Sequence, residues 1–441
     1  MNEITLSIID IENFKLNLIE WLKNYNHFAI LDSNNLSKYY PYYKDNYSFD
    51  LIACAGKQDI IKSFFSDSFK TFENIENSKK WWFGYIGYDC KNDIELLSSS
   101  NPDYIKFYDL YFFSPEIIFL LKNNKLILLS LKFQESELFQ IIEDIKKIKY
   151  NRSDFNNRQY IIQQRIDSTQ YYKKSLELIN YIHKGYIYEI NFCIEFFVDN
   201  YIDDPVNIFK KLKKFSPAPF SCLFRFNDLY IISASPERFL KKMKNVVISQ
   251  PMKGTIKRGN SPQEDLKNRI YLKNSLKERA ENIMAVDVVR NDLSKFNKTK
   301  KIQVVDLCGV YTFPVVHQMI STIEAEIENN ASNVQLIKSL FPMASMTGAP
   351  KIEAMKLIDE FEESKRGIFS GSAGYIDPNG NFDFNVIIRS FIYNKNSKYL
   401  SFSAGSALTA MSNVYKEYEE CLLKVIPLIK SINQEENVRK I

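Results

Sequence analysis

The pentapeptide Pro251-Met252-Lys253-Gly254-Thr255 (PMKGT) follows a β-branched run at residues 245–249. Such a run predicts a strand, so Lys253 is expected at a strand end that faces a pocket. Gly254 would let a ligand approach the main chain closely. A lysine becomes a nucleophile when burial or a nearby cation lowers its pKa and leaves some neutral amine. The pentapeptide therefore predicts a nucleophile, although taken alone it also fits a solvated turn lysine.

The composition predicts a globular chain with mixed charge. It has 441 residues, 45% of them hydrophobic, and a formal net charge of +5. This length can bury one large core or two ordinary ones. Basic and acidic residues are interspersed, as at 146–149 beside 135–144, which argues against nucleic acid as a partner. The apolar region 108–133 is interrupted by polar residues, so no membrane-spanning helix is expected.

The cysteine pattern and the first residues predict the compartment. No two cysteines form a Cys-x-x-Cys pair, which favours reduced, buried thiols. The chain opens with Met1-Asn2-Glu3 and has no basic-then-apolar run there, so no secretory signal is expected. A cytoplasmic location is the prediction. The six cysteines are Cys54, Cys90, Cys193, Cys222, Cys308 and Cys421.

Two regions are expected. Residues 1–150 should form an α/β region with strands at 28–31, 51–55 and 116–121, and the aromatic, glycine-containing stretch 81–89 predicts a strand packed closely on another layer. The polar, asparagine-rich segment 146–159 is the expected boundary. A second region follows at residues 160–430.

The second region opens with a predicted helix and strand. Ser168 or Thr169 would cap the helix and Gly185 would end it. The expected apolar face of the helix is Tyr172, Leu176, Ile179 and Ile182. In the strand at 187–198, polar side chains on one face line either a cavity or a solvated sheet edge. These are Glu189, Asn191 and Cys193, opposite Tyr188, Ile190, Phe192 and Ile194.

A glutamate in SPERF, residues 235–239, is a candidate partner for the lysine. If Glu237 lay on a neighbouring hairpin strand, it would face Lys253 across the sheet. The pair would supply a nucleophile and a proton donor. A surface Glu-Arg pair is the alternative interpretation.

A Glu-x-x-Glu pattern occurs twice in stretches with helical periodicity. Glu278 and Glu281 form the first pair, and Glu417 and Glu420 the second. Carboxylates at i and i+3 share one helix face, so two such helices could present four carboxylates to one point. Hard oxygen ligands of this kind suit Mg²⁺. Each pair alone would more often be a solvated face.

Other segments could bind anions. The small residues at 344–351 lead into a predicted helix at 352–361, whose first N–H groups could form an anion cradle, and residues 403–407 after another strand could add donors. Arg389 ends the apolar run 386–388 and could grip a carboxylate at two points. His317 follows an apolar stretch and would more often be a satisfied core residue than a catalyst.

The order of these motifs resembles the chorismate-utilising enzyme family over roughly residues 165–427. The series is Gly185 with Tyr188-Glu189-Ile190-Asn191, SPERF, PMKGT, KERAENIMAVDVVRNDLS from Lys277, His317 with Ser321, FPMASMTGAPKIEAM from Phe341, RGIFSGSAGY from Arg366, NVIIRS from Asn385, SAGSALT from Ser403 and KEYEECLLK from Lys416.

The resemblance implies an α+β fold of the anthranilate synthase component I type. Two β-sheets would pack together with helices outside, the active site would lie between the sheets, and residues 1–150 would complete the sandwich. Aminodeoxychorismate synthases in this family typically carry a lysine before the glycine of PMKGT, where anthranilate synthases carry alanine. Lys253 therefore implies Mg²⁺-dependent amination of chorismate at carbon 4, on the route to 4-aminobenzoate and folate.

The resemblance also implies residue roles. Lys253 would attack ring carbon 2 while Glu237 acts as the general acid. Two glutamates would ligate Mg²⁺ (Glu281 and Glu420) and two would hold its waters (Glu278 and Glu417). The substrate would be held by Arg389 with N–H groups near Gly371, Ala404 and Gly405, and bordered by His317, Thr347, Gly254 and Thr255.

Ammonia is expected from a separate glutamine amidotransferase subunit, because the sequence has no Gly-Cys-Gly nucleophile loop. Two alternatives remain: anthranilate synthase component I, and a catalytically silent regulatory paralogue. Three positions depart from the family pattern. Phe369 replaces a usual tyrosine, Glu189 a usual glutamine, and residues 411–415 lack a common Asp-Ser-Asp-Pro pattern.

Overall fold

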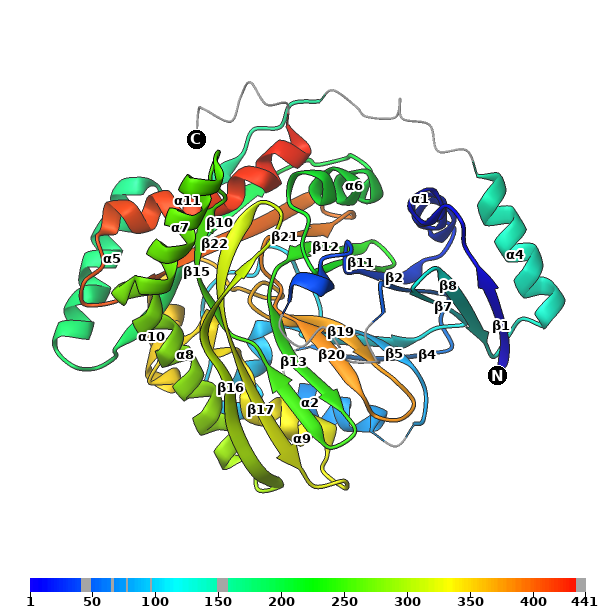
Figure 1. The fold of residues 1–441 in the computed structure, drawn as a ribbon. Coiled ribbons are helices and arrows are strands. Elements are labelled where there is room, and N and C mark those ends of the chain that lie inside the picture. Colours follow the sequence, from blue (N-terminus) through cyan, green and yellow to red (C-terminus); the bar gives the residue numbers. More distant parts are fainter. Residues whose placement is uncertain (41–48, 65–66, 77, 96, 149–157, 434–441) are drawn as a thin grey trace.

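Two large antiparallel β-sheets form the frame of the computed structural model (Figure 1). The structure describes residues 1–40, 49–64, 67–76, 78–95, 97–148 and 158–433. Within them, one sheet has twelve strands and the other ten, and helices flank the pair. The predicted α+β sandwich is confirmed.

The first sheet combines strands from both ends of the chain. Its order is β1 (Asn2–Ser7), β8 (Lys125–Ser130), β7 (Ile117–Lys122), β3 (Leu51–Ala55), β2 (His27–Asp32), β11 (Phe220–Phe226), β12 (Leu229–Ser235), β21 (Ser390–Asn394), β22 (Tyr399–Leu408), β10 (Glu189–Val198) and β18 (Gly348–Ala349), with β9 (Gln163–Gln164) also on β10.

The second sheet also combines strands from distant parts of the chain. Its order is β15 (Met252–Lys257), β17 (Val316–Ile327), β14 (Val246–Ser249), β13 (Arg238–Met243), β20 (Phe382–Asn385), β19 (Ser372–Ile376), β5 (Trp82–Ile86), β6 (Leu110–Ser114) and β4 (Asp59–Ser63), with β16 (Thr299–Thr312) on β17. The four strands expected before residue 122 are all formed. Most of the expected boundary, residues 149–157, lies outside the described residues.

Helices cover the outer faces of both sheets (Figure 1). On the first sheet these are α1 (Ile11–Leu22), α4 (Glu135–Lys147), α5 (Ser168–His183), α6 (Pro205–Phe215), α10 (Lys351–Phe361) and α11 (Val414–Ile432). On the second they are α2 (Ser68–Phe72), α8 (Leu276–Lys295) and α9 (Asn333–Leu340). The remaining described elements are α3 (Asn92–Glu95), α7 (Pro262–Asn274) and the 3₁₀ turns η1 (Ser37–Tyr39), η2 (Glu73–Ile75), η3 (Tyr88–Lys91) and η4 (Ala344–Met346).

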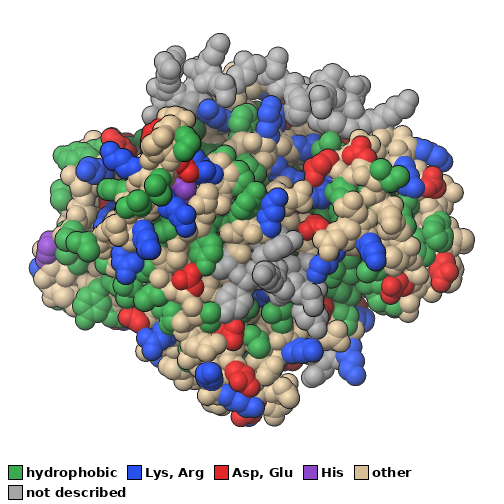
Figure 2. Space-filling view, in the orientation of Figure 1, with side chains coloured by type: hydrophobic (Ala, Val, Ile, Leu, Met, Phe, Trp, Pro, Cys, Tyr) green, Lys and Arg blue, Asp and Glu red, His purple; other side chains and the backbone are tan. Residues whose placement is uncertain are grey.

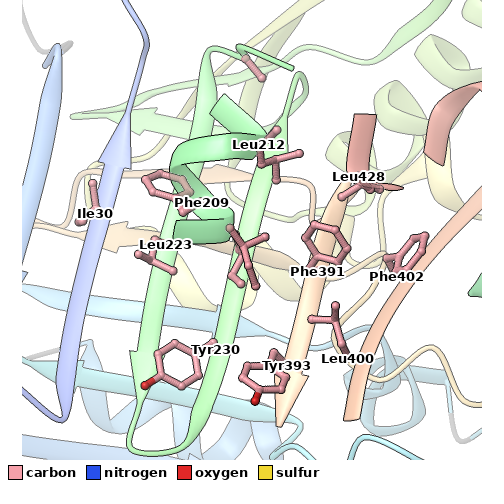
Figure 3. Close-up of a cluster of buried hydrophobic side chains, with 14 of the residues drawn as sticks. Ile30, Phe209, Leu212, Leu223, Tyr230, Phe391, Tyr393, Leu400, Phe402 and Leu428 are labelled. Atoms are coloured by element: carbon pink, nitrogen blue, oxygen red, sulfur yellow. The ribbon is translucent and has the colours of Figure 1, made fainter. Parts of the chain in front are cut away.

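Strand alternation divides the core into layers. Along β2, Phe28 and Ile30 pack under the helices, whereas Ala29 lies in a separate cluster that includes Phe83 of the second sheet. Figure 3 shows the outer layer, where side chains of α6 and α11 meet β11, β12, β21 and β22. The central strands of the first sheet are therefore anchored on both faces by buried apolar side chains.

Helix α5 differs from its predicted face. Its N-cap is Asp167, which accepts from the Gln170 N–H, rather than Ser168 or Thr169. The buried stripe runs through Tyr171, Ser175, Leu178, Ile179 and Ile182, so the expectation that Tyr172 and Leu176 lead the apolar face is wrong. Apolar residues occur on both sides of the stripe, and packing selects the one that faces the sheet. Gly185 ends the helix as expected, at φ +81°.

The surface and the cysteines agree with the sequence patterns. On the face shown in Figure 2, lysine and arginine side chains are mixed with acidic and apolar ones. All six cysteines are free and buried, as predicted. Across the described ranges, no helix is both long and apolar enough to cross a membrane.

Two leucines on α5 test this packing. Leu178 is fully buried, whereas Leu176 is 59% exposed. Replacing Leu178 with alanine should lower the free energy of unfolding by about 2–5 kcal/mol, because a cavity remains in the core. Leu176→Ala should change it by less than about 0.5 kcal/mol. Urea unfolding of both variants makes the comparison, and similar losses would contradict the assigned face.

Candidate active site

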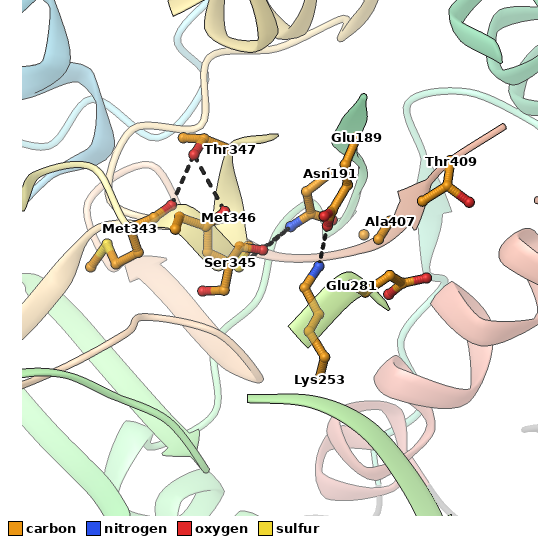
Figure 4. Close-up of polar contacts among 12 residues, drawn as sticks. Glu189, Asn191, Lys253, Glu281, Met343, Ser345, Met346, Thr347, Ala407 and Thr409 are labelled. Atoms are coloured by element: carbon orange, nitrogen blue, oxygen red, sulfur yellow. Dashed lines mark hydrogen bonds and ion pairs between the residues drawn. The ribbon is translucent and has the colours of Figure 1, made fainter. Parts of the chain in front are cut away.

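An ion pair between Lys253 and Glu189 crosses from one sheet to the other (Figure 4). Lys253 lies on β15 of the second sheet and Glu189 on β10 of the first, with 2.5 Å between Nζ and Oε1. The two side chains are only 11% and 5% exposed. The polar face of β10 is therefore buried between the sheets rather than solvated at an edge, and the predicted lysine lies there.

A β-bulge shapes the PMKGT segment. The register of β15 against β17 shifts between Lys253 and Thr255, and Gly254 has φ +74°. A Cβ at Gly254 would lie 2.8 Å from Glu278 Oε2, so glycine is needed both for the backbone angle and for the approach of α8. Gln318 fixes the bulge: its Nε2 donates to the Gly254 carbonyl, and its Oε1 accepts from the Thr255 hydroxyl.

Glu237 and Arg389 lie where two neighbouring strand connections pass between the sheets. Glu237 separates β12 from β13, and Arg389 separates β20 from β21. The connections are tied together: Val386 N–H donates to the Glu237 carbonyl, and Ala234 N–H donates to the Arg389 carbonyl, both at 3.1 Å. The fold thus brings together two residues that are 152 positions apart.

Glu237 is not on a strand next to Lys253, so that prediction is wrong: β17 and β14 separate β15 from β13. Its buried carboxyl nevertheless reaches the site, where Ser345 Oγ donates to Oε1 at 2.7 Å. Burial raises the pKa of Glu237 to about 7, although Ser345, Lys253 and Arg389 favour the charged form. Near neutral pH this side chain can hold a proton and release it.

The charge of Lys253 also differs from the expectation. Burial by itself lowers the pKa of the ammonium, but Glu189, Glu281 and Glu237 outweigh burial and raise it. Lys253 therefore rests as an ammonium ion paired with Glu189. For it to act as a nucleophile, its proton must first move to an acceptor.

Arg389 carries an unpaired guanidinium. Among the described residues its side chain has no hydrogen bond or salt bridge, and burial lowers its pKa while Glu237 opposes that change. Its backbone has φ +51°, a strained angle for a residue with a side chain. A partly buried, unpaired arginine beside a strand crossing is suited to bind an anionic group.

Two of the predicted main-chain donors lie within a strand rather than after one. Ala404 and Gly405 lie inside β22, in register with Ile194 and Cys193 of β10. Pairing of β21 with β22 ends at Ser401. Among the described residues, the part of β22 beyond Ser401 therefore has no partner strand on its β21 side. Gly371 differs, because its N–H donates to the Ile368 carbonyl within a turn.

Thr347 and His317 are satisfied inside the protein. The Thr347 hydroxyl donates to the Met343 carbonyl at 3.1 Å (Figure 4). His317 Nδ1 and Nε2 each lie 3.0 Å from a partner oxygen, on Thr312 and Asp265. The segment containing Thr347 pairs with β10, and the N–H groups of Met346 and Thr347 bond within η4. These two N–H groups are therefore satisfied before α10 begins, and the anion cradle expected at the first N–H groups of α10 stays a prediction.

The four paired glutamates lie on α8 and α11, with Lys277 between them. Lys277 Nζ is 2.7 Å from Glu417 Oε1 and 3.8 Å from Glu281 Oε1. Glu420 instead pairs with Lys424, at 2.7 Å. Within the described residues no three His, Cys, Asp or Glu side chains are placed to hold a metal ion together, so the four carboxylates do not meet at one point.

The donor set still fits a divalent cation. Glu281 Oε1 and Glu417 Oε2 are buried and have no hydrogen-bond partner among the described residues. Burial raises the pKa of Glu281 to about 7 and also raises that of Glu278. Unsatisfied, electrostatically coupled carboxylate oxygens on two helices are the hard ligands that Mg²⁺ uses.

Comparison with known proteins identifies the family. The family model for chorismate binding enzymes matches residues 26–430. The chain belongs to this family. Its curated relatives include a probable chloroplastic aminodeoxychorismate synthase of Oryza sativa subsp. japonica, 38% identical over 277 residues, which are 62% of this chain and 30% of that protein.

Two further proteins match this chain over a larger share of their own length. Aminodeoxychorismate synthase component 1 of Escherichia coli K12 is 36% identical over 265 residues, 60% of this chain and 58% of that protein. The chain thus spans less than two thirds of both curated relatives. The crystal structure of anthranilate synthase component I from Streptococcus pneumoniae TIGR4 shares the fold, with a TM-score of 0.75, 21% identity, and coverage of 90% of this chain and 91% of that one.

The contacts of three side chains of this chorismate binding enzyme were not predicted from the sequence. Glu189 was noted on a polar strand face and as a departure from the usual glutamine, but its lysine partner lies 64 positions away. Lys277 lies four residues before Glu281, a helical spacing that could have shown it. Ser345 gave no signal, because its contact with Glu237 depends on the packing of η4.

The pKa of Glu237 predicts a pH-dependent stability. An ordinary glutamate has a pKa of 4.5, so folding favours protonated Glu237, and this stabilisation is lost as pH rises from 4.5 through about 7. Glu237→Gln removes the loss. Relative to the wild type, this variant should gain about 3 kcal/mol in free energy of unfolding between about pH 4 and about pH 8.

Urea unfolding at the two pH values measures this gain. The exposed Glu177→Gln variant on α5 is the control and should show no such change. A Glu237→Gln effect of equal size at both pH values would contradict the raised pKa.

Proposed function

We propose that this chain is the synthase component of aminodeoxychorismate synthase, which aminates chorismate at carbon 4 with ammonia. The observation that carries the proposal is a buried lysine between the sheets, together with a buried carboxyl whose pKa is about 7. The pair offers a nucleophile and a proton donor in one site. Similarity to proteins named aminodeoxychorismate synthase supports the same choice.

In the proposed first step, neutral Lys253 attacks ring carbon 2 and forms a carbon–nitrogen bond. The ring double bond shifts, the hydroxyl leaves carbon 4, and protonated Glu237 gives it a proton so that water departs. Ammonia then bonds to carbon 4, the double bond shifts back, and Lys253 leaves as an amine. The excess proton on the new amino group returns to Glu237. Covalent catalysis divides one difficult displacement into two allylic steps.

Arg389 is proposed to hold the enolpyruvyl carboxylate, because its guanidinium is unpaired and lies in reach of the charge of Glu237. Glu281 and Glu420 would ligate Mg²⁺, and Glu278 and Glu417 would hold its waters. When bound, the ion supplies positive charge that neutralises the ring carboxylate. Lys277 now forms a salt bridge with Glu417 between α8 and α11, so it would have to move away when the ion binds.

Ammonia is proposed to come from a separate glutamine amidotransferase subunit in the cytoplasm. The Escherichia coli relative is named component 1, which supports a second component, and the six free thiols fit a reducing compartment. Gel filtration of this chain with the glutaminase subunit should show a complex. Separate elution at micromolar concentrations would count against it.

The direct test is incubation of the protein with chorismate, Mg²⁺ and ammonium salt. Chorismate should be consumed without pyruvate until aminodeoxychorismate lyase is added. Immediate release of pyruvate with fluorescent anthranilate would establish the anthranilate synthase alternative. If no chorismate is consumed with ammonium salt or with the glutaminase partner, the silent-paralogue alternative holds.

Removing the proposed nucleophile should abolish turnover. Lys253→Ala is expected to lower kcat by about a thousandfold or more, since the covalent route is lost. Lys257→Ala on the same strand is the control, because Lys257 is exposed and should leave kcat unchanged. Retention of more than a tenth of the activity by Lys253→Ala would contradict the covalent mechanism.

The metal assignment predicts a loss of affinity. Glu281→Gln removes one carboxylate charge and should weaken Mg²⁺ binding by about tenfold or more in calorimetry. The exposed Glu419→Gln variant on α11 belongs to the same motif and should bind like the wild type. Equal affinities for all three proteins would contradict a metal site on these helices.

A further inference from the structure

Glu189 has no role in the reaction proposed above, yet its contact with the nucleophile is close. Its Oε1 accepts from Lys253 Nζ at 2.5 Å, and both side chains are buried between the sheets. In the described part of the chain, Glu189 is the one carboxylate that forms a hydrogen bond with this ammonium. A base that removes a proton must lie within hydrogen-bonding distance of it, and Glu189 does.

The other described acids around Lys253 have different proposed roles and do not form a hydrogen bond with it. Glu237, from the β12–β13 connection, accepts from Ser345 and serves as the proposed acid at carbon 4. Glu281 and Glu278, from α8, and Glu420, from α11, belong to the proposed metal site. All four acids act on Lys253 through their charge, and within the described residues none of them forms a hydrogen bond with it. Arg389, the remaining cation near Glu237, has no salt bridge within the described residues.

The backbone holds Glu189 firmly toward the lysine. Glu189 pairs with Ala349 of β18, and the next residues of β10 run in register with β22. Asn191, on the same face of β10, is fixed by its N–H bond to the Thr347 carbonyl. The backbone that carries the Glu189 carboxylate is thus held by β18 at Glu189 and by β22 from Ile190 onward.

We propose that Glu189 is the general base that accepts the Lys253 proton before attack. The inference rests on the proposed function. The proton moves from Nζ to Oε1, and the ammonium–carboxylate pair becomes an amine and a carboxylic acid. The amine lone pair then bonds to carbon 2. When Lys253 is later expelled as an amine, the proton returns from Glu189, so no external base is consumed.

Exclusion of water by a bound substrate favours this transfer, because burial disfavours the charged form of both groups. The transfer removes two opposite charges from a buried position before the ring carbon approaches. Glutamine at this position could hold the lysine but could not accept its proton.

The proposal fixes a proton count that can be measured. If Glu189 keeps the proton, the reactive pair has the same total protonation as the resting pair, and its population does not depend on pH. If the lysine must lose its proton to solvent, the reactive fraction rises about tenfold per pH unit below the lysine pKa. In the Glu189→Gln variant the lysine must lose its proton to solvent, whether or not Glu189 is the base in the wild type.

The test compares turnover of Glu189→Gln and the wild type from about pH 6 to about pH 8, with free ammonia held constant. The ratio of the two rates cancels the titrations of Glu237, Glu281 and other shared groups. The proposal predicts that this ratio rises about tenfold per pH unit. A constant ratio would overturn the proposal, because Glu189 would then only balance the charge of Lys253 and would not accept its proton. Glu195→Gln on the same strand, whose acid pairs with Arg165, is the control and should give a constant ratio.

A second measurement needs neither the variant nor chorismate turnover. Wild-type protein is acylated with a small neutral reagent over the same pH range, and the modification of Lys253 is followed by mass spectrometry. Lys253 should react at a nearly constant rate, while exposed Lys257 in the same sample reacts about tenfold faster per pH unit. An equal slope for both lysines would overturn the proposal. Failure of chorismate consumption would overturn the function alone.

Discussion

The salt bridge between Lys253 and Glu189 is the constraint on which the site depends, because it joins the two sheets at a buried point. Buried charges are costly unless they are paired, so β10 and β15 must meet here. The strand connections carrying Glu237 and Arg389 cross between the same sheets and are bonded to each other. The sandwich thus gathers the proposed base, nucleophile, acid and anion-binding cation from four separate stretches of sequence.

The site holds more acids than bases, and the structure accommodates them in three ways. Glu189 and Glu417 each have a lysine partner. Glu237 and Glu281 have pKa values raised to about 7 by burial, so neutral forms are available to them. Buried oxygens of Glu281 and Glu417 are left unsatisfied. Unpaired buried acids lower stability, and they are expected where a cation and an anionic substrate bind together.

The sequence predicted the parts of the site with local signatures and missed those set by long-range packing. The strand end at Lys253 and the helical spacing of Glu278 with Glu281 followed from local periodicity. The position of Glu237 did not, because strand order in a sheet is not encoded by adjacency in sequence. The face of α5 was misassigned since Tyr171 and Tyr172 are both compatible with an apolar stripe. The raised pKa of Lys253 depends on three acids from other elements.

The central claim is that Lys253 bonds to the substrate, and the most direct measurement is mass spectrometry of the protein after rapid quenching. The protein is mixed with chorismate and Mg²⁺ in ammonia-free buffer and then digested. The account predicts a mass gain of chorismate minus water on the peptide that contains Lys253, and loss of this adduct when ammonia is added. Product formation on adding ammonia, without any adduct on that peptide beforehand, would contradict it.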